Sequence, residues 1–165
     1  MSGYKRTRYL IAGDHGISVE FGNSLDEEIN RKVQKMMHAL EKAAIPGVIE
    51  TNPTIRSLFV YYDPLKIGVK KLIQEMRKVE GQMADITLPP SRLFEIPVVY
   101  GGEYGPDFEE VAKLLGLTPL EVIRNHSGKE YFIYDTGFIG GSAHFKIPAN
   151  SPLAILITSI KLRGM

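Results

Sequence analysis

The sequence contains no cysteine, and this absence removes several classes of site. Without a thiol there is no disulfide scaffold, no thiolate zinc site and no cysteine nucleophile, and a reducing, cytoplasmic compartment is favoured. Neither sign of charge is in excess, because 20 basic residues balance 19 acidic ones. Nucleic-acid binding is therefore not expected, since it usually requires a basic surface.

Long apolar runs and low-complexity tracts are also missing. No stretch approaches the roughly 18 apolar residues of a membrane span, and the polar, basic first residues do not resemble a signal peptide. The hydrophobic share of 44% in 165 residues is that of an ordinary globular protein with one or two domains.

The first 88 residues alternate between strand-like and helix-like patterns. Strands are predicted over residues 9–12, 17–21, 48–51 and 58–62. A helix over 25–44 is predicted to begin with a capping box of Ser24 and Glu27, and a second helix to begin at Asp63-Pro64. The last two strands would be joined by a turn at Asn52-Pro53. Helices on one face of a mainly antiparallel sheet would form a two-layer α+β sandwich.

A linker over 81–91 separates this region from residues 89–165. The second region is predicted to contain strands over 94–100, 131–134 and 153–160. Two helices lie between the first two strands. One is expected to begin with a capping box of Asp107 and Glu110 and to end at Gly116. The other would run from a Thr118 N-cap to about His126.

The glycine-rich loop before the first of these helices is one candidate site. Residues 101–107 bring free amides to a helix N-terminus, where an anion can bind. The alternative is a tight turn that simply requires its glycines, and Asp107 competes for the same amides. No P-loop motif is present.

His126 is a second candidate, because it ends a short helix just before a turn. The helix dipole there favours the charged imidazole, so the residue is either a helix cap or a group that handles a proton. A dyad of His126 with Ser142 stays open as an alternative. The spacing of the four histidines predicts no metal site.

Several segments together resemble one family. Residues 96–107 read Ile-Pro-Val-Val-Tyr-Gly-Gly-Glu-Tyr-Gly-Pro-Asp, and His126-Ser127 and Tyr131-Phe-Ile-Tyr134 follow. In the first half, Ala12-Gly-Asp14 and Ser57-Leu-Phe-Val-Tyr-Tyr-Asp-Pro64 fit as well. The pattern is similar to the KipI/allophanate hydrolase subunit 1 family over about residues 8–141. The chain departs from it near the end, where Gly140 and Ser142 stand in place of the family's Pro and Phe and a following Pro- and Gly-rich segment is absent.

The resemblance implies an α+β fold in two domains, a two-layer sandwich over 1–88 and an incomplete cyclophilin-like β-barrel over 89–165. It also implies an accessory subunit of an ATP-dependent 5-oxoprolinase, which opens the lactam of 5-oxoproline to glutamate through a phosphorylated intermediate. The partners would be a homologous barrel subunit and a further subunit. ATP would serve the whole complex, with no metal site in this chain.

The same resemblance implies the site residues. His126 would donate or accept a proton, and a group of loop residues would shape the binding wall. That group consists of Tyr100, Gly101, Gly102, Glu103, Gly105, Pro106, Asp107, Gly137, Phe138 and Gly141.

The alternative function is a binding module, because KipI inhibits a sporulation histidine kinase by docking on it. A barrel that lacks strands would present an edge for strand addition. The uncharged segment 153–158 is predicted to be covered by self-association or by a partner, since exposed strand edges pair with other chains. Prolyl isomerase activity is suggested only by the barrel shape, which does not fix function.

Overall fold

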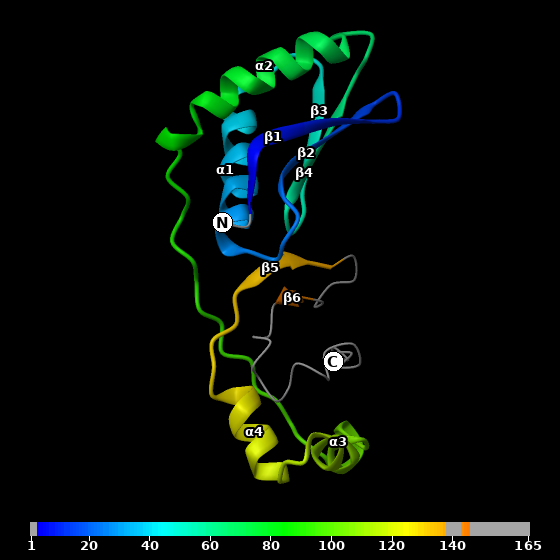
Figure 1. Cartoon of the computed structure of the whole chain (residues 1–165), viewed down its shortest axis with the longest axis vertical. Coiled ribbons are helices and arrows are strands. Elements are labelled where there is room, and N and C mark those ends of the chain that lie inside the picture. The colour runs from blue at the N-terminus through cyan, green and yellow to red at the C-terminus, as the bar shows by residue number, and fades with distance from the viewer. Residues whose placement is uncertain (1–2, 138–142, 146–165) are drawn as a thin grey trace. The chain divides into compact units, whose positions relative to one another are not determined.

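The computed structural model describes residues 3–137 and 143–145 (Figure 1). The chain divides into two compact units, one up to Pro90 and one from Ser91 onward.

The first unit is built on a four-stranded antiparallel sheet. Its strands are β1 (Gly3–Ala12), β2 (Gly16–Gly22), β3 (Val48–Pro53) and β4 (Ser57–Tyr62), in the order β1-β2-β4-β3. Hairpins join β1 to β2 and β3 to β4, and β2 pairs with β4 at the centre (Figure 1). All four predicted strands are therefore confirmed, with β1 beginning several residues earlier than its apolar run.

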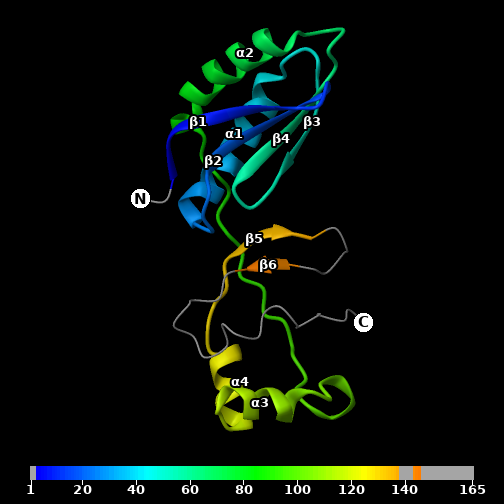
Figure 2. The same cartoon turned by 45° about the vertical axis from the view of Figure 1, so that its right-hand side comes forward.

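Two helices, α1 (Glu27–Ala43) and α2 (Val69–Gly81), complete this unit. Figure 2 shows both helices against one face of the sheet. On that face the register pairs Val19 with Leu58 and Ile17 with Val60, and all four side chains are fully buried. The helices add Met36 and Leu72, among others, to the same core. Burial of these apolar side chains is the main force that holds the two layers together.

Three predicted details of this unit are wrong. The cap of α1 is Asp26, whose carboxylate accepts from the amides of Glu28 and Ile29, and not Ser24. A carboxylate at this position also complements the helix dipole. Asn52 and Pro53 lie inside β3, and the turn follows them. Asp63 and Pro64 form a separate turn, and α2 begins only at Val69.

The edge strand β1 is attached to α2 by the carboxylate of Glu80, which accepts hydrogen bonds from two hydroxyls on β1. Tyr9 Oη donates to Glu80 Oε2 at 2.7 Å, and Thr7 Oγ1 donates to the other oxygen, Oε1. The guanidinium of Arg77 lies 5.4 Å from the centre of the Tyr9 ring. The two hydrogen bonds join residues more than 70 positions apart and fix the end of α2 over the sheet edge.

The second unit contains α3 (Phe108–Leu115), α4 (Pro119–Ser127), β5 (Ile133–Thr136) and β6 (Ala143–Phe145), with a 3₁₀ turn at Gly102–Tyr104. Another 3₁₀ turn, Met83–Asp85, closes the first unit. The helices α3 and α4 share a small core around Ala112 and Val122. The strands β5 and β6 form an antiparallel ribbon.

The helix signals in this unit are mostly confirmed. Thr118 forms a complete capping box with Glu121, and Gly116 ends α3 in the left-handed conformation. The capping box at Asp107 is wrong, because that side chain makes no capping hydrogen bond.

The strands predicted for this unit agree less well with the structure than the helices do. The strand expected over 94–100 is wrong: these residues are irregular, with Phe94 and Ile96 mostly exposed. Pro97 lacks an amide hydrogen, and a strand forms only where a neighbour pairs with it. β5 lies two residues later than the predicted strand over 131–134. The strand over 153–160 lies outside the described residues, and the cyclophilin-like barrel remains a prediction.

Candidate functional site

A tyrosine and a histidine from two separate segments meet in the second unit. Tyr100 Oη and His126 Nδ1 lie 2.6 Å apart, which is a short hydrogen bond between side chains 26 residues apart. Both side chains are partly buried. Tyr131 adds a second contact, because its hydroxyl donates to the backbone carbonyl of His126 at 2.9 Å.

Local structure explains how the pair is brought together. The capping box at Thr118 fixes the start of α4, and His126 lies in its last turn. Tyr100 immediately precedes Gly101, which has a φ of +74°, a conformation that side-chain-bearing residues rarely adopt. The chain then folds back so closely that a Cβ on Gly105 would lie 2.9 Å from the backbone nitrogen of Gly101. The glycines therefore build the turn that follows Tyr100.

The pair lies within a row of aromatic rings, here called the aromatic cluster: Phe108, Tyr100, His126, Tyr131 and Phe145. Neighbouring rings along this row have centroids 5.1 to 6.1 Å apart. The rings come from α3, α4, β6, the segment before α3 and the segment between α4 and β5. Such packing excludes water from one side of the imidazole and limits its rotation.

Burial shifts the pKa values of His126 and Tyr100 in opposite directions. Burial lowers the pKa of His126, since desolvation penalises the charged imidazolium. Burial likewise raises the pKa of Tyr100. Desolvation thus acts against the charged form of His126, which the helix dipole is expected to favour. At neutral pH the pair consists of a neutral phenol and a neutral imidazole.

The structure treats the predicted site residues in four ways. Tyr100 and His126 are in contact, and Gly101 and Gly105 form the adjoining turn. Residues with exposed positions on the same loop are Gly102, Glu103, Pro106 and Asp107. Gly137 follows β5 and, in the part of the chain described here, makes no hydrogen bond to His126. Phe138, Gly141 and Ser142 lie outside the described residues, so the Ser142–His126 dyad stays untested.

The remaining members of the cluster are site components that the sequence does not reveal. Phe108 and Phe145 carry no motif signal, and Tyr131 is only part of a family pattern. The one usable hint is the density of aromatic residues between positions 94 and 145. Which of those rings meet depends on tertiary packing, which the spacing along the chain does not encode.

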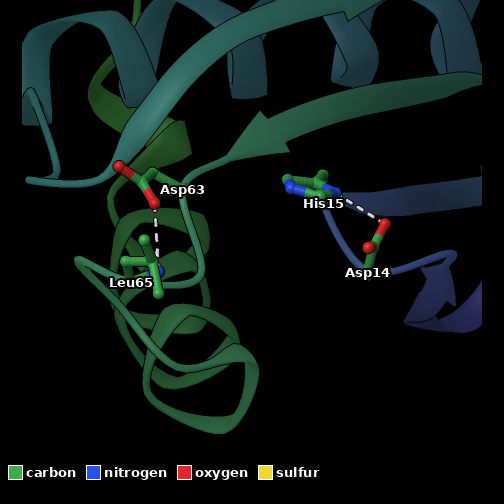
Figure 3. Close-up of polar contacts among 4 residues, drawn as sticks. All are labelled: Asp14, His15, Asp63 and Leu65. Carbon is green, nitrogen blue, oxygen red and sulfur yellow. Dashed lines mark hydrogen bonds and ion pairs between the residues drawn. The ribbon is translucent and has the colours of Figure 1, made fainter.

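A second histidine lies at the tip of the β1–β2 hairpin, in the first unit. Figure 3 shows His15 Nδ1 and Asp14 Oδ1, 2.5 Å apart, together with Asp63, whose Oδ1 accepts from the amide of Leu65. The carbonyl of His15 also accepts from the amide of Tyr62 at 2.9 Å, so the hairpin tip is joined to the end of β4. The hydrogen bond from His15 lowers the pKa of Asp14. Both side chains are largely exposed, so this pair forms a surface contact and encloses no binding site.

The described residues contain neither a metal-binding cluster nor a membrane-spanning helix. No group of three or more histidine and acidic side chains within residues 3–137 and 143–145 is placed to hold a metal ion. None of the helices in this part of the chain is long and apolar enough to cross a membrane.

Several known proteins are similar to this chain. The B subunit of 5-oxoprolinase from Bacillus subtilis (strain 168) is 38% identical over 146 residues, which cover 81% of this chain and 61% of that protein. The corresponding B subunit from Escherichia coli O157:H7 is 31% identical over 140 residues, covering 83% and 62% respectively. The chain thus spans about three-fifths of the length of these relatives.

Solved structures and family descriptions agree with this similarity. The crystal structure of TTHA0988 superimposes with a TM-score of 0.60 at 33% identity, covering 76% of this chain and 23% of that one. The carboxyltransferase domain, subdomains C and D, matches residues 7–151. This match covers most of the chain and includes Tyr100, His126 and Tyr131. The family resemblance seen in the sequence is confirmed: the chain belongs to the carboxyltransferase domain, subdomain C and D, family.

Proposed function

We propose that the chain is an accessory subunit of an ATP-dependent 5-oxoprolinase, in the position of its B subunit. The observation that carries the proposal is the 38% identity to a 5-oxoprolinase B subunit over 146 residues. The complex would open the lactam of 5-oxoproline to glutamate through a phosphorylated intermediate. ATP is a cofactor of this complex as a whole, and no residue of this chain is assigned to it.

The word subunit in the names of these relatives implies a multi-subunit assembly. We propose as partners a homologous subunit with its own cyclophilin-like barrel and one further subunit. Residues 89–165 would contribute part of such a barrel. The exposed side chains of Phe94, Ile96 and Val99 support the proposal of a partner subunit, because exposed apolar residues favour contact with another chain.

Within this assembly His126 would contact the substrate. A neutral imidazole in a partly desolvated position acts either as a hydrogen-bond donor to a carbonyl oxygen or as a base. The Tyr100 hydroxyl occupies Nδ1, so Nε2 is the ring nitrogen that would take either role. The Gly101–Asp107 loop lies beside this pair and would form the wall of the site.

Reconstitution tests the proposal. The chain should be purified from its native host together with co-eluting proteins, and those proteins should then be produced separately. We expect no turnover from the chain alone and ATP-dependent formation of glutamate when all subunits are combined. Omission of this chain should abolish the activity.

Three results would contradict the proposal. Turnover by the chain alone would show that it does not depend on partners. An active complex that does not need the chain would remove it from the reaction. Co-elution with a histidine kinase, together with inhibition of that kinase, would instead favour the alternative of a binding module.

A further inference from the structure

Tyr100 has a specific relationship to the ring of His126 that its place in the glycine-rich loop does not predict. Its hydroxyl lies 2.6 Å from Nδ1 and not from the backbone or from Nε2. The Tyr131 hydroxyl, by contrast, donates to the backbone carbonyl of the same residue. The two hydroxyls therefore bind different parts of His126, one the ring and one the main chain.

The chemistry of the two partners decides the direction of the Tyr100–His126 bond. A phenol, with an ordinary pKa near 10, is a better hydrogen-bond donor than a neutral imidazole N–H. An imidazole nitrogen, whose conjugate acid has an ordinary pKa near 6.5, is a better acceptor than a phenol oxygen. The favoured arrangement is thus Tyr100 Oη–H donating to an unprotonated Nδ1. In the neutral ring the proton must then be on Nε2.

We infer that Tyr100 is a positioning residue that fixes His126 in the Nε2–H tautomer, so that the ring presents a hydrogen-bond donor, and not a base, at Nε2. In the part of the chain that the structure describes, Nε2 has no hydrogen-bond partner of its own. The group that it would bind is an oxygen acceptor, such as a carbonyl or carboxylate.

The packing of the aromatic cluster supports this role. Phe108 lies against the Tyr100 ring and Tyr131 against the His126 ring, with centroids 5.7 and 6.1 Å apart. These contacts restrict both rings to the geometry in which the hydrogen bond forms. Only a neutral imidazole has two tautomers, and desolvation favours the neutral ring near neutral pH.

The identification of the acceptor with the lactam carbonyl of 5-oxoproline rests on the proposed function, whereas the tautomer does not. In that reaction the carbonyl oxygen is the atom that accepts the phosphoryl group, and a preorganised N–H donor would hold the lactam in position for that step. A general base at Nε2 would need the opposite tautomer, in which Nδ1 carries the proton and Nε2 has a free lone pair. In the reaction His126 would therefore act as a hydrogen-bond donor and not as a base.

Nitrogen NMR on the 165-residue chain tests the tautomer in the absence of the other subunits. A long-range ¹H–¹⁵N spectrum of uniformly labelled protein separates protonated from unprotonated ring nitrogens. The signal of His126 among the four histidines is assigned from its absence in His126→Gln. We expect an unprotonated Nδ1 and a protonated Nε2 at neutral pH.

Tyr100→Phe and Tyr131→Phe form a matched pair, since each removes one hydroxyl and keeps its ring. Tyr100→Phe should shift the tautomer ratio at least about fivefold toward Nδ1–H, the change expected when one hydrogen bond is lost. Tyr131→Phe should leave the ratio unchanged. An Nδ1–H tautomer in the wild-type chain overturns the inference, and so does a Tyr100→Phe spectrum with an unchanged ratio. Failure of reconstituted turnover would instead count against the proposed function alone.

Discussion

The hydroxyl of Tyr9 on β1 donates a 2.7 Å hydrogen bond to the carboxylate of Glu80 on α2. The two residues are 71 positions apart, and Thr7 donates to the other carboxylate oxygen. Edge strands have unpaired backbone groups on one side and are easily lost from a sheet. The Glu80 carboxylate therefore adds a side-chain attachment to a strand that has backbone partners on one side only.

Removal of the Tyr9 hydroxyl should weaken this attachment. We expect Tyr9→Phe to lower the free energy of unfolding by about 1.5–3 kcal/mol, the usual range for a hydrogen bond to a charged group. Urea denaturation of the purified chain measures the loss. Tyr61→Phe, on the exposed face of the same sheet, is the control and should change stability by less than about 0.5 kcal/mol. Equal effects of the two substitutions would contradict the attachment.

The same tyrosine should make stability depend on pH in alkaline solution. Burial, followed by the hydrogen bond and charge of Glu80, raises the pKa of Tyr9 well above its ordinary value near 10. Above about pH 10 the unfolded chain loses the phenolic proton of Tyr9, whereas the folded chain keeps it. The free energy of unfolding therefore falls as pH rises. Between about pH 9 and 11 the unfolding free energies of wild type and Tyr9→Phe should converge. Parallel curves would show that Tyr9 does not titrate differently in the two states.

The start of α1 offers a test of which residue caps it. The Asp26 carboxylate accepts hydrogen bonds from two backbone amides, whereas the buried hydroxyl of Ser24 has no hydrogen-bond partner among the residues that the structure describes. Asp26→Ala should destabilise the first unit by about 1 kcal/mol, as the loss of an N-cap usually does. Ser24→Ala should be neutral or slightly stabilising, because it removes an unsatisfied polar group. A larger loss from Ser24→Ala than from Asp26→Ala would restore Ser24 as the cap.

His126 should give the opposite pH dependence to Tyr9. Burial lowers its pKa in the folded chain, so below an ordinary value near 6.5 the unfolded chain binds the proton first. The contribution of His126 to the free energy of unfolding is therefore fully present above about pH 7. It is lost as pH falls toward the pKa of the folded state. His126→Gln cannot titrate, and its unfolding free energy should fall less between about pH 7 and 5. A raised pKa of His126 in an NMR titration would contradict this sign.

The sequence predicts the first unit better than the second, for a physical reason. The strands and helices of the first unit follow from local periodicity in the sequence. Apolar residues alternate in β2, at Ile17, Val19 and Phe21, and recur at helical spacing in α1, as at Val33 and Met36. Caps and turns are less certain, since Ser24 and Asp26 are both good capping residues only two positions apart. The choice between them depends on packing that no local pattern records.

The candidate site shows the same limit. Its main residues, Tyr100 and His126, are identifiable through family resemblance, but their contact is not. The lowered pKa of His126 cannot be foreseen either, because the sequence shows the end of the helix but not the burial of the imidazole. The expected strand over 94–100 has the right apolar residues but lacks a pairing partner among those described. Strand formation is a property of two segments, so one of them alone cannot specify it.

Turnover per assembled complex, measured for His126→Asn, tests the central claim most directly. Asparagine keeps polarity but places no donor at the position of Nε2. Assembly should be measured first, by co-elution, so that turnover is compared only between intact complexes. We predict normal assembly with a loss of about 10²–10³-fold in rate, as for removal of one preorganised donor. Turnover within about threefold of wild type, well under the 1.4 kcal/mol of a tenfold effect, would contradict the assignment of His126 to the reaction.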